Sequence, residues 1–166
     1  MQVPTRKSEQ HNKKSPFDPY LTEEKFALLR NKLKKMQERR PVAAQEVKRL
    51  AEMGDFSENA GYQLAKGRLR GLNQRILDLE YQLKNALIIK PNKNTRTIEL
   101  GHRVTLRSRG QEKTYLILGS TETDPTAGVI SHHSPLGQAL IGKCVGEIVT
   151  VQLPDKELTY KILKIA

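Results

Sequence analysis

Apolar residues recur every three or four positions through two stretches of this chain, and such spacing predicts amphipathic helices. In the first stretch they are Phe26, Leu29, Leu33, Met36, Ala43, Val47 and Leu50, and in the second Ala65, Leu69, Leu72, Ile76, Leu79, Leu83 and Ala86. A repeat of about 3.5 residues, with charged residues between the apolar ones, is typical of a coiled coil. Only the segment MGDFS, residues 53–57, separates the two stretches. The second helix must therefore double back, and the pattern predicts an antiparallel coiled-coil hairpin over residues 21–90.

Two features of the first helix concern its start and its middle. Thr22 precedes Glu23 and Glu24, and a hydroxyl cap followed by acids suits the positive end of a helix dipole. Pro41 has no N–H to donate, so we expect it to interrupt the first arm with a kink.

Arms of this length, at about 1.5 Å per residue, would make a rod roughly 40 Å long. Such a rod could carry its tip to a site far from the rest of the protein.

The pattern changes after PNKN, residues 91–94, which we interpret as a linker. Alternating apolar and polar residues predict strands over residues 98–106, 114–118, 128–130, 148–153 and 158–165. Residues 134–142 are predicted to form a short helix, because Ser134 can cap it, Pro135 suits its first position and Gly142 can end it. The predicted fold class is therefore α+β, with a basic flexible extension at 1–20, the hairpin at 21–90 and a small α+β domain at 91–166.

The composition adds a class of partner to this outline. The 166 residues include 29 Lys and Arg against 18 Asp and Glu, which gives a net charge of +11. Such an excess favours a polyanionic partner, nucleic acid first and an anionic membrane surface second. No apolar run approaches the roughly 18 residues of a spanning helix, and the N-terminus lacks the apolar core of a secretory signal. The single cysteine, Cys144, fits a reducing compartment, so we expect a cytoplasmic protein.

Candidate chemistry lies between the two helices, in the segment GDFSENAGY at residues 54–62. Asp55 and Glu58 are three residues apart, so both carboxylates can face the same way at a helix start. The structural interpretation is a capping box, in which both side chains satisfy backbone N–H groups. The functional interpretation is a site for a hard cation such as Mg²⁺, which takes oxygen ligands. Two carboxylates are too few for a tight site, so another molecule would have to supply the remaining ligands.

Basic residues lie behind this segment on both arms. They are Lys48, Arg49, Lys66, Arg68 and Arg70, and we call them the basic collar. A solvated charged face is the common explanation of such residues on a coiled coil. Acids at a tip with bases behind them also suit a device that grips a nucleic-acid backbone and presents a metal ion to it.

These stretches resemble the bacterial Gre transcript-cleavage factors, GreA and GreB, which rescue stalled RNA polymerase. The matching stretches are RP at 40–41, GDFSENAGY at 54–62 and RLR at 68–70. The segment SPLGQALIGK at 134–143 resembles the C-terminal signature of the same family. The basic collar and the run over residues 62–70 look closer to GreB than to GreA.

The resemblance implies a fold and a mode of action. The C-terminal domain would be FKBP-like and would dock RNA polymerase at the rim of its secondary channel, while the hairpin would enter the channel. Asp55 and Glu58 would then help to hold the second Mg²⁺ of the polymerase active site, beside the 3′ end of backtracked nascent RNA. The residues expected to support the tip are Gly54, Ser57, Asn59 and Tyr62. Such a factor is not an enzyme by itself, has no cofactor of its own and binds no membrane, and we expect it to be a monomer.

Two other functions remain open. A channel-binding inhibitor on the same scaffold would block the polymerase without promoting cleavage, although the presence of Asp55 and Glu58 argues against it. A basic coiled coil that binds DNA or RNA directly would show salt-sensitive binding to naked nucleic acid as its main activity. His132 and His133, adjacent in a predicted loop, are interpreted as structural or solvated residues, and Cys144 as a small apolar group.

Overall fold

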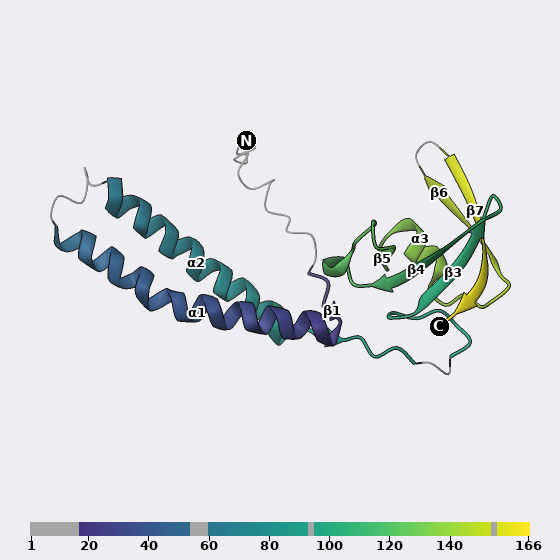
Figure 1. The fold of residues 1–166 in the computed structure, drawn as a ribbon, viewed down its shortest axis with the longest axis horizontal. Helices are drawn as coiled ribbons and strands as arrows, with labels where there is room; N and C mark the ends of the chain where they lie inside the picture. Colours follow the sequence, from purple (N-terminus) through teal and green to yellow (C-terminus); the bar gives the residue numbers. More distant parts are fainter. Residues whose placement is uncertain (1–16, 54–59, 93–94, 154–155) are drawn as a thin grey trace, which may run out of the picture.

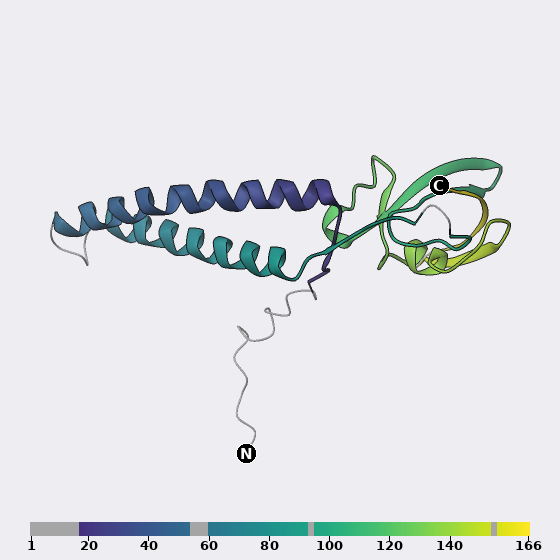
Figure 2. The same ribbon diagram turned by 90° about the horizontal axis from the view of Figure 1, so that it is seen from below.

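The computed structural model describes residues 17–53, 60–92, 95–153 and 156–166, and its architecture is α+β as predicted. Helices α1 (Glu23–Glu52) and α2 (Ala60–Lys84) form an antiparallel hairpin. A domain with a curled sheet follows, and the hairpin and this domain lie end to end (Figure 1, Figure 2). The C-terminal end of α1 and the N-terminal end of α2 lie at the end of the hairpin away from the sheet domain (Figure 1).

The apolar repeat predicts the packing of the hairpin correctly. Each apolar position named above is buried or half-buried, whereas most of the charged residues between them are exposed. Ile76 and Leu79 on α2 are only 5% and 8% exposed, but no residue of α1, all of which the structure describes, is buried. The helices are amphipathic, and none that the structure describes is both long enough and apolar enough to cross a membrane. A two-helix rod buries one seam, and here the seam is deepest around Ile76 and Leu79.

Pro41 does not interrupt the first arm, so the predicted interruption was wrong, while the kink stays a prediction. Helix α1 runs from Glu23 to Glu52 with Pro41 inside it. Proline removes the hydrogen bond to the carbonyl of Gln37, one turn earlier. Pro41 and Gln37 are both exposed, so water can satisfy this carbonyl. The side chain of Gln37 also donates to Glu80 Oε1 on α2 at 2.9 Å, which ties the two arms together beside the proline.

The C-terminal domain is built on a five-stranded sheet with the strand order β5-β4-β3-β7-β6. Its strands are β3 (Arg103–Ser108), β4 (Gln111–Leu118), β5 (Val129–Ser131), β6 (Ile148–Leu153) and β7 (Lys156–Ile165). Neighbouring strands are antiparallel except β4 and β5, which are parallel. The core between the sheet and helix α3 (Pro135–Leu140) consists of Ile98, Val104, Leu106, Ile117, Leu140, Val149 and Ile162.

The predicted short helix is confirmed together with its cap. The hydroxyl of Ser134 accepts a hydrogen bond from the Gly137 N–H at 3.0 Å, and Pro135 occupies the first helical position. Gly142 follows the helix with φ +79°, a left-handed conformation that glycine adopts at little cost. The motif over residues 134–142 thus specifies α3 locally, and α3 packs its buried Leu140 against the sheet.

A short parallel ladder closes the base of the hairpin. Strand β1 (Tyr20–Leu21) pairs with β2 (Leu87–Ile88), so the residues just before α1 and just after α2 lie side by side. Leu21 is fully buried there, and the rings of Phe17 and Tyr81 meet edge to face with centroids 5.9 Å apart. Residues 17–20, which we assigned to the basic extension, are therefore part of the packed structure.

The segment before α1 also contacts the C-terminal domain, at the 3₁₀ turn η1 (Ser120–Glu122). The N–H and the hydroxyl of Thr22 donate to the two carboxylate oxygens of Glu122 at 2.8 and 2.5 Å. The Ser120 N–H donates to Asp18 Oδ2 at 2.6 Å. We call this contact of Asp18 and Thr22 with η1 the domain joint, because it attaches the base of the hairpin to the sheet domain.

Candidate functional site at the hairpin tip

The tip residues singled out in the sequence adjoin the described part of the hairpin. Gly54, Asp55, Ser57, Glu58 and Asn59 lie outside the described residues, so their roles stay predictions. These residues belong to the segment that connects the two helices, since α1 ends at Glu52 and α2 begins at Ala60. The segment that carries Asp55 and Glu58 therefore joins the two helix ends that lie away from the sheet domain (Figure 1).

Tyr62 and Lys66 interact in the first turns of α2. The Nζ of Lys66 lies 5.6 Å from the ring centroid of Tyr62, which is within the range of a cation–π interaction. Tyr62 is half-buried and Lys66 is exposed. Tyr62 therefore lies where it can hold one cation of the basic collar close to the start of α2.

The part of the collar on α1 is partly neutralised by neighbouring acids. Arg49 forms two hydrogen bonds with Glu46, from Nε to Oε2 at 2.9 Å and from Nη2 to Oε1 at 2.8 Å. These bonds raise the pKa of the Arg49 guanidinium and lower the pKa of the Glu46 carboxyl. Lys48 Nζ lies 3.9 Å from Glu52 Oε1, with both side chains largely exposed, so this pair contributes little to stability. Lys48 is therefore more available to an anionic ligand than Arg49.

The part of the collar on α2 is less neutralised. Arg68 and Arg70 are exposed, and neither forms an ion pair with any residue in the described ranges. Lys66 and Arg70 are four residues apart and share one helix face, whereas Arg68 points to another. The collar residues of α2 therefore lie on two different faces of the helix and do not form one continuous patch.

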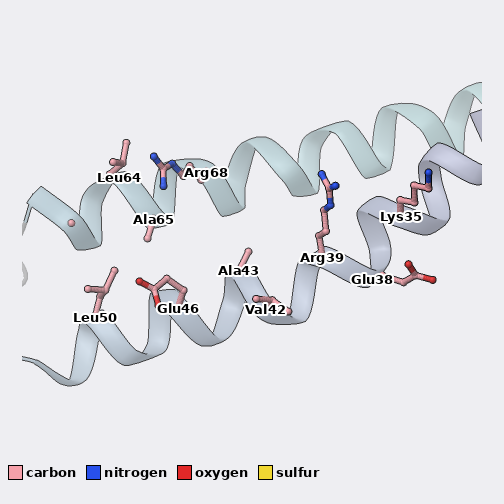
Figure 3. Close-up of a pocket in the computed structure, with 11 residues that line it drawn as sticks. Lys35, Glu38, Arg39, Val42, Ala43, Glu46, Leu50, Leu64, Ala65 and Arg68 are labelled. Atoms are coloured by element: carbon pink, nitrogen blue, oxygen red, sulfur yellow. The ribbon is translucent and has the colours of Figure 1, made fainter.

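An open apolar groove of about 860 Å³ runs between the arms beside the collar (Figure 3). Its lining residues are Lys35, Glu38, Arg39, Val42, Ala43, Glu46, Leu50, Gly61, Leu64, Ala65 and Arg68. Ala43 and Leu50 on α1 and Ala65 on α2 point into the space between the helices, and Arg39 extends from α1 toward α2 (Figure 3). Because two of these seam positions are alanines, the side chains leave unfilled space. The hairpin is therefore packed less tightly near the tip than at its base.

No sequence pattern pointed to Asp18, which the structure places in the domain joint. Asp18 is 5% exposed, and its carboxylate accepts the N–H groups of Tyr20 at 3.1 Å and Ser120 at 2.6 Å. Burial raises the pKa of this carboxyl, but the hydrogen bonds from Ser120 and Tyr20 and the nearby His132 outweigh burial and lower the pKa below its ordinary value. Ser120 is 102 positions away along the chain, so spacing within one segment cannot reveal the contact.

His132 and His133 lie beside Asp18, in the loop between β5 and α3. His132 Nδ1 is 3.6 Å from Asp18 Oδ2 and 3.3 Å from the Leu118 carbonyl oxygen. The His132 ring also meets the Tyr20 ring edge to face, with centroids 5.5 Å apart, whereas His133 is exposed. These contacts agree with the interpretation of His132 as a structural residue. Its partner Asp18, however, was not indicated by the sequence.

Two family models match the chain, one for each of its main parts. The model for "Transcription elongation factor, N-terminal" matches residues 19–88. The model for "Transcription elongation factor, GreA/GreB, C-term" matches residues 93–166. The two matches follow one another along the chain and together cover most of it.

Curated relatives are similar over most of their own length. The chain is 37% identical over 149 residues to the transcription elongation factor GreA of Bacillus cereus, which covers 87% of this chain and 94% of that protein. It is 40% identical over 128 residues to GreA of Mycoplasmopsis pulmonis, which covers 76% of this chain and 80% of that protein. Both names indicate GreA, which goes against the interpretation of the collar as closer to GreB. A solved structure of GreA factor homolog 1 from Thermus thermophilus is 26% identical, covers 90% of this chain and 99% of that chain, and has a TM-score of 0.41.

Proposed function

Because the chain belongs to the GreA/GreB family of transcription elongation factors, we propose that it binds RNA polymerase and stimulates cleavage of the nascent transcript in backtracked complexes. The hairpin enters the secondary channel, and the active site of the polymerase hydrolyses the RNA. Elongation then resumes from the new 3′ end. The chain is an accessory factor in this reaction and has no activity without the polymerase.

The observation that carries this proposal is the separation between the two ends of the molecule. Helix α1 has 30 residues, which corresponds to a length of about 45 Å. The helix ends that adjoin residues 54–59 lie at one end of the hairpin, and the sheet domain lies at the other (Figure 1, Figure 2). A protein of this shape can dock with one end and act with the other inside a channel.

Asp55 and Glu58 supply the chemistry in this proposal. Their two carboxylates suit Mg²⁺, which prefers oxygen ligands and usually keeps several waters. A second metal ion in such hydrolysis activates the attacking water or steadies the leaving oxygen. Asp55 and Glu58 would donate oxygen ligands toward an ion that the polymerase also holds and would orient the attacking water. Both residues lie outside the described ranges, so the chemistry of this donor set is what supports the assignment.

The basic collar would bind the extruded RNA. The 3′ segment of a backtracked transcript is single-stranded and has to share the channel with the hairpin. We assign its phosphates chiefly to Arg68 and Arg70, because Arg49 is already paired with Glu46. Each phosphate contact releases counterions, so this contribution should weaken as the salt concentration rises.

The C-terminal domain would dock at the rim of the channel, and the domain joint would then set the direction of the hairpin. The hydrogen bonds of Thr22 and Asp18 to η1 support this role, because they fix the start of α1 to the sheet domain. The partners in this proposal are RNA polymerase and the 3′ end of nascent RNA. The chain would act as a monomer in the cytoplasm, with Mg²⁺ shared with the polymerase and no cofactor of its own.

A purified backtracked elongation complex of a bacterial RNA polymerase tests this function. The full chain, added with Mg²⁺, is expected to shorten 5′-labelled transcripts and to restore elongation when nucleotides are supplied. Binding that arrests the polymerase without shortening the RNA would overturn the proposal in favour of the channel-binding inhibitor. Binding only to free DNA or RNA would overturn it in favour of a nucleic-acid-binding coiled coil.

A further inference from the structure

Asp18, His132 and His133 bring three metal-ligating side chains together at the domain joint. Each offers one ligand atom, and these atoms all lie within 4.8 Å of one another. Asp18 precedes α1, whereas the two histidines lie in the loop between β5 and α3. The cluster therefore spans the contact between the base of the hairpin and the sheet domain, and the proposed cleavage function makes no use of it.

The fold holds the Asp18 carboxylate and the His132 ring in place. Asp18 is 5% exposed, and its oxygens accept the N–H groups of Tyr20 and Ser120. Its Oδ2 lies 3.6 Å from His132 Nδ1, and the edge-to-face contact with Tyr20 restricts the plane of the His132 ring. The contact of His132 Nδ1 with the Leu118 carbonyl is long, 3.3 Å, so little is lost if this nitrogen, in its deprotonated form and without a change of ring position, binds a metal ion instead.

His133 completes the cluster from the exposed side. Its ring centroid lies 3.8 Å from that of His132, and the two rings are tilted by 38°. The His133 N–H donates to Ser131 Oγ at 3.0 Å, and this hydroxyl is 2.9 Å from Ser120 Oγ. The loop backbone is thereby attached to η1, while the exposed side chain of His133 can rotate toward an ion.

Two imidazoles and one carboxylate are a donor set of zinc sites, and imidazole also suits copper and nickel. Ligand distances of about 2.0–2.2 Å place ligand atoms roughly 3.3–3.5 Å apart in a tetrahedral site, so the 3.6 Å between Asp18 and His132 needs little adjustment. We propose that Asp18, His132 and His133 form a site for a divalent transition metal ion such as Zn²⁺, which fastens the hairpin to the sheet domain. Three protein ligands leave room for water or for a donor from a bound partner.

The other histidine in the described ranges is already engaged. His102 is 2% exposed, its Nδ1 accepts the Glu99 N–H at 3.2 Å, and its Nε2 lies 3.0 Å from the Asn92 carbonyl oxygen. Among the histidines in the described ranges, His132 and His133 are therefore the ones available to bind a metal ion.

The test is titration of the full chain, without an affinity tag, with Zn²⁺ at neutral pH in a calorimeter, with Co²⁺ absorption as a readout of tetrahedral coordination. The wild type is expected to bind one Zn²⁺ with micromolar or tighter affinity, and its unfolding temperature should rise with Zn²⁺. His133→Ala removes an exposed ligand, so the fold should persist while the affinity falls by at least the roughly tenfold that loss of an outer-shell partner costs. His11→Ala, which changes a histidine outside the described residues, is the matched control and should bind like the wild type.

Absence of stoichiometric Zn²⁺ binding by the wild type would overturn the proposal. Equal affinities of the wild type and His133→Ala would also overturn it, because the metal would then be bound elsewhere. Asp18→Asn keeps the shape of the side chain and is expected to weaken Zn²⁺ binding as well, so wild-type affinity of this variant would exclude the three-residue site. None of these measurements depends on transcript cleavage, so their outcome is separate from that of the proposed function.

Discussion

Thr22 and Glu122 lie 100 positions apart in the chain and are joined by two hydrogen bonds. The hydroxyl of Thr22 donates to Glu122 and also accepts the Lys25 N–H at 3.2 Å, so the same side chain caps α1. One residue therefore starts the long helix and attaches it to the sheet domain. This double role couples the direction of the hairpin to the domain that we propose docks on the polymerase.

Changes at Thr22 and at Glu122 should each reduce the free energy of unfolding, and their effects should not be additive because the two residues contact each other. Thr22→Ala removes the helix cap, which costs about 1 kcal/mol, together with the hydroxyl bond to Glu122. Glu122→Gln removes the charge and leaves one acceptor oxygen, so the amide cannot accept both donors of Thr22, at a cost of about 1 kcal/mol. Urea unfolding of the wild type, both single variants and the double variant should give a coupling energy of about 1 kcal/mol. Additive losses would show that the two residues do not act together.

Gly119 is expected to be intolerant of a side chain because the hairpin base packs directly on it. A Cβ at this position would lie 2.2 Å from the Tyr20 carbonyl oxygen, so Gly119→Ala should lower the free energy of unfolding by about 1–3 kcal/mol through overpacking. Gly71→Ala is the matched control, since a Cβ there meets nothing within 4 Å. In the middle of α2 that change should stabilise the protein by about 0.5–1 kcal/mol. Equal effects of the two changes in urea unfolding would contradict the close packing at Gly119.

Glu147 should contribute to the pH dependence of stability. Hydrogen bonds from the Cys144 N–H at 2.8 Å and from Lys143 lower the pKa of its carboxyl below the ordinary value of 4.5. The folded state therefore favours the ionised form of Glu147. The stability that this carboxylate contributes is complete above the ordinary pKa of the unfolded chain, and it is lost as the pH falls through the lower pKa of the folded state. The unfolding temperature of Glu147→Gln should lie below that of the wild type near neutral pH, and the two curves should converge in acid. Glu157→Gln, a change at an exposed glutamate, controls for the loss of one charge; a constant gap between Glu147→Gln and the wild type would refute the prediction.

The arginines of the basic collar should differ in their effect on rescue. Arg68→Ser with Arg70→Ser should slow transcript cleavage in backtracked complexes more than Arg49→Ser does, because Arg49 already pairs with Glu46. The difference should be largest at low salt and shrink as salt rises, since it reflects contacts with phosphates. Cleavage rates measured over a salt series on one backtracked template check this. Rates that match the wild type at every salt concentration would mean that these arginines only add surface charge.

Local patterns in the sequence predicted the helices of this fold well. The 3.5-residue repeat identified the seam because every position in it depends on neighbours one turn away, and Ser134 with Pro135 identified the start of α3 for the same reason. Pro41 misled the prediction because the freed carbonyl of Gln37 can bond to water and the packing of the seam holds α1 together despite the cost of the proline. The strand β4 begins earlier than predicted because Arg109 and Gly110, with φ +52° and +79°, form a tight turn.

Contacts between distant segments could not be predicted in this way. Asp18 meets Ser120 and His132 because the hairpin base packs against the sheet domain, which brings segments far apart in the sequence together. Nothing in the residues around Asp18 marks it as a buried carboxylate, and the adjacent histidines suggested only structural or solvated residues, without a partner for either. Asp55 and Glu58 at the tip were predicted from a compact local motif, but they lie outside the described ranges, so their role stays a prediction.

The most direct test of the central proposal uses the double variant Asp55→Asn, Glu58→Gln on a backtracked elongation complex. The rate of transcript cleavage is measured, and the affinity of the variant for the polymerase is measured in parallel. Both changes keep the side-chain shape but remove the charges that would bind Mg²⁺. We predict that the variant binds the polymerase like the wild type and no longer stimulates cleavage. Glu38→Gln, the same kind of change at an exposed residue of α1, is the control and should stimulate cleavage like the wild type. If the two carboxylates only cap a helix, each change costs about 1 kcal/mol of stability and cleavage persists. Normal cleavage by the double variant would contradict the proposal.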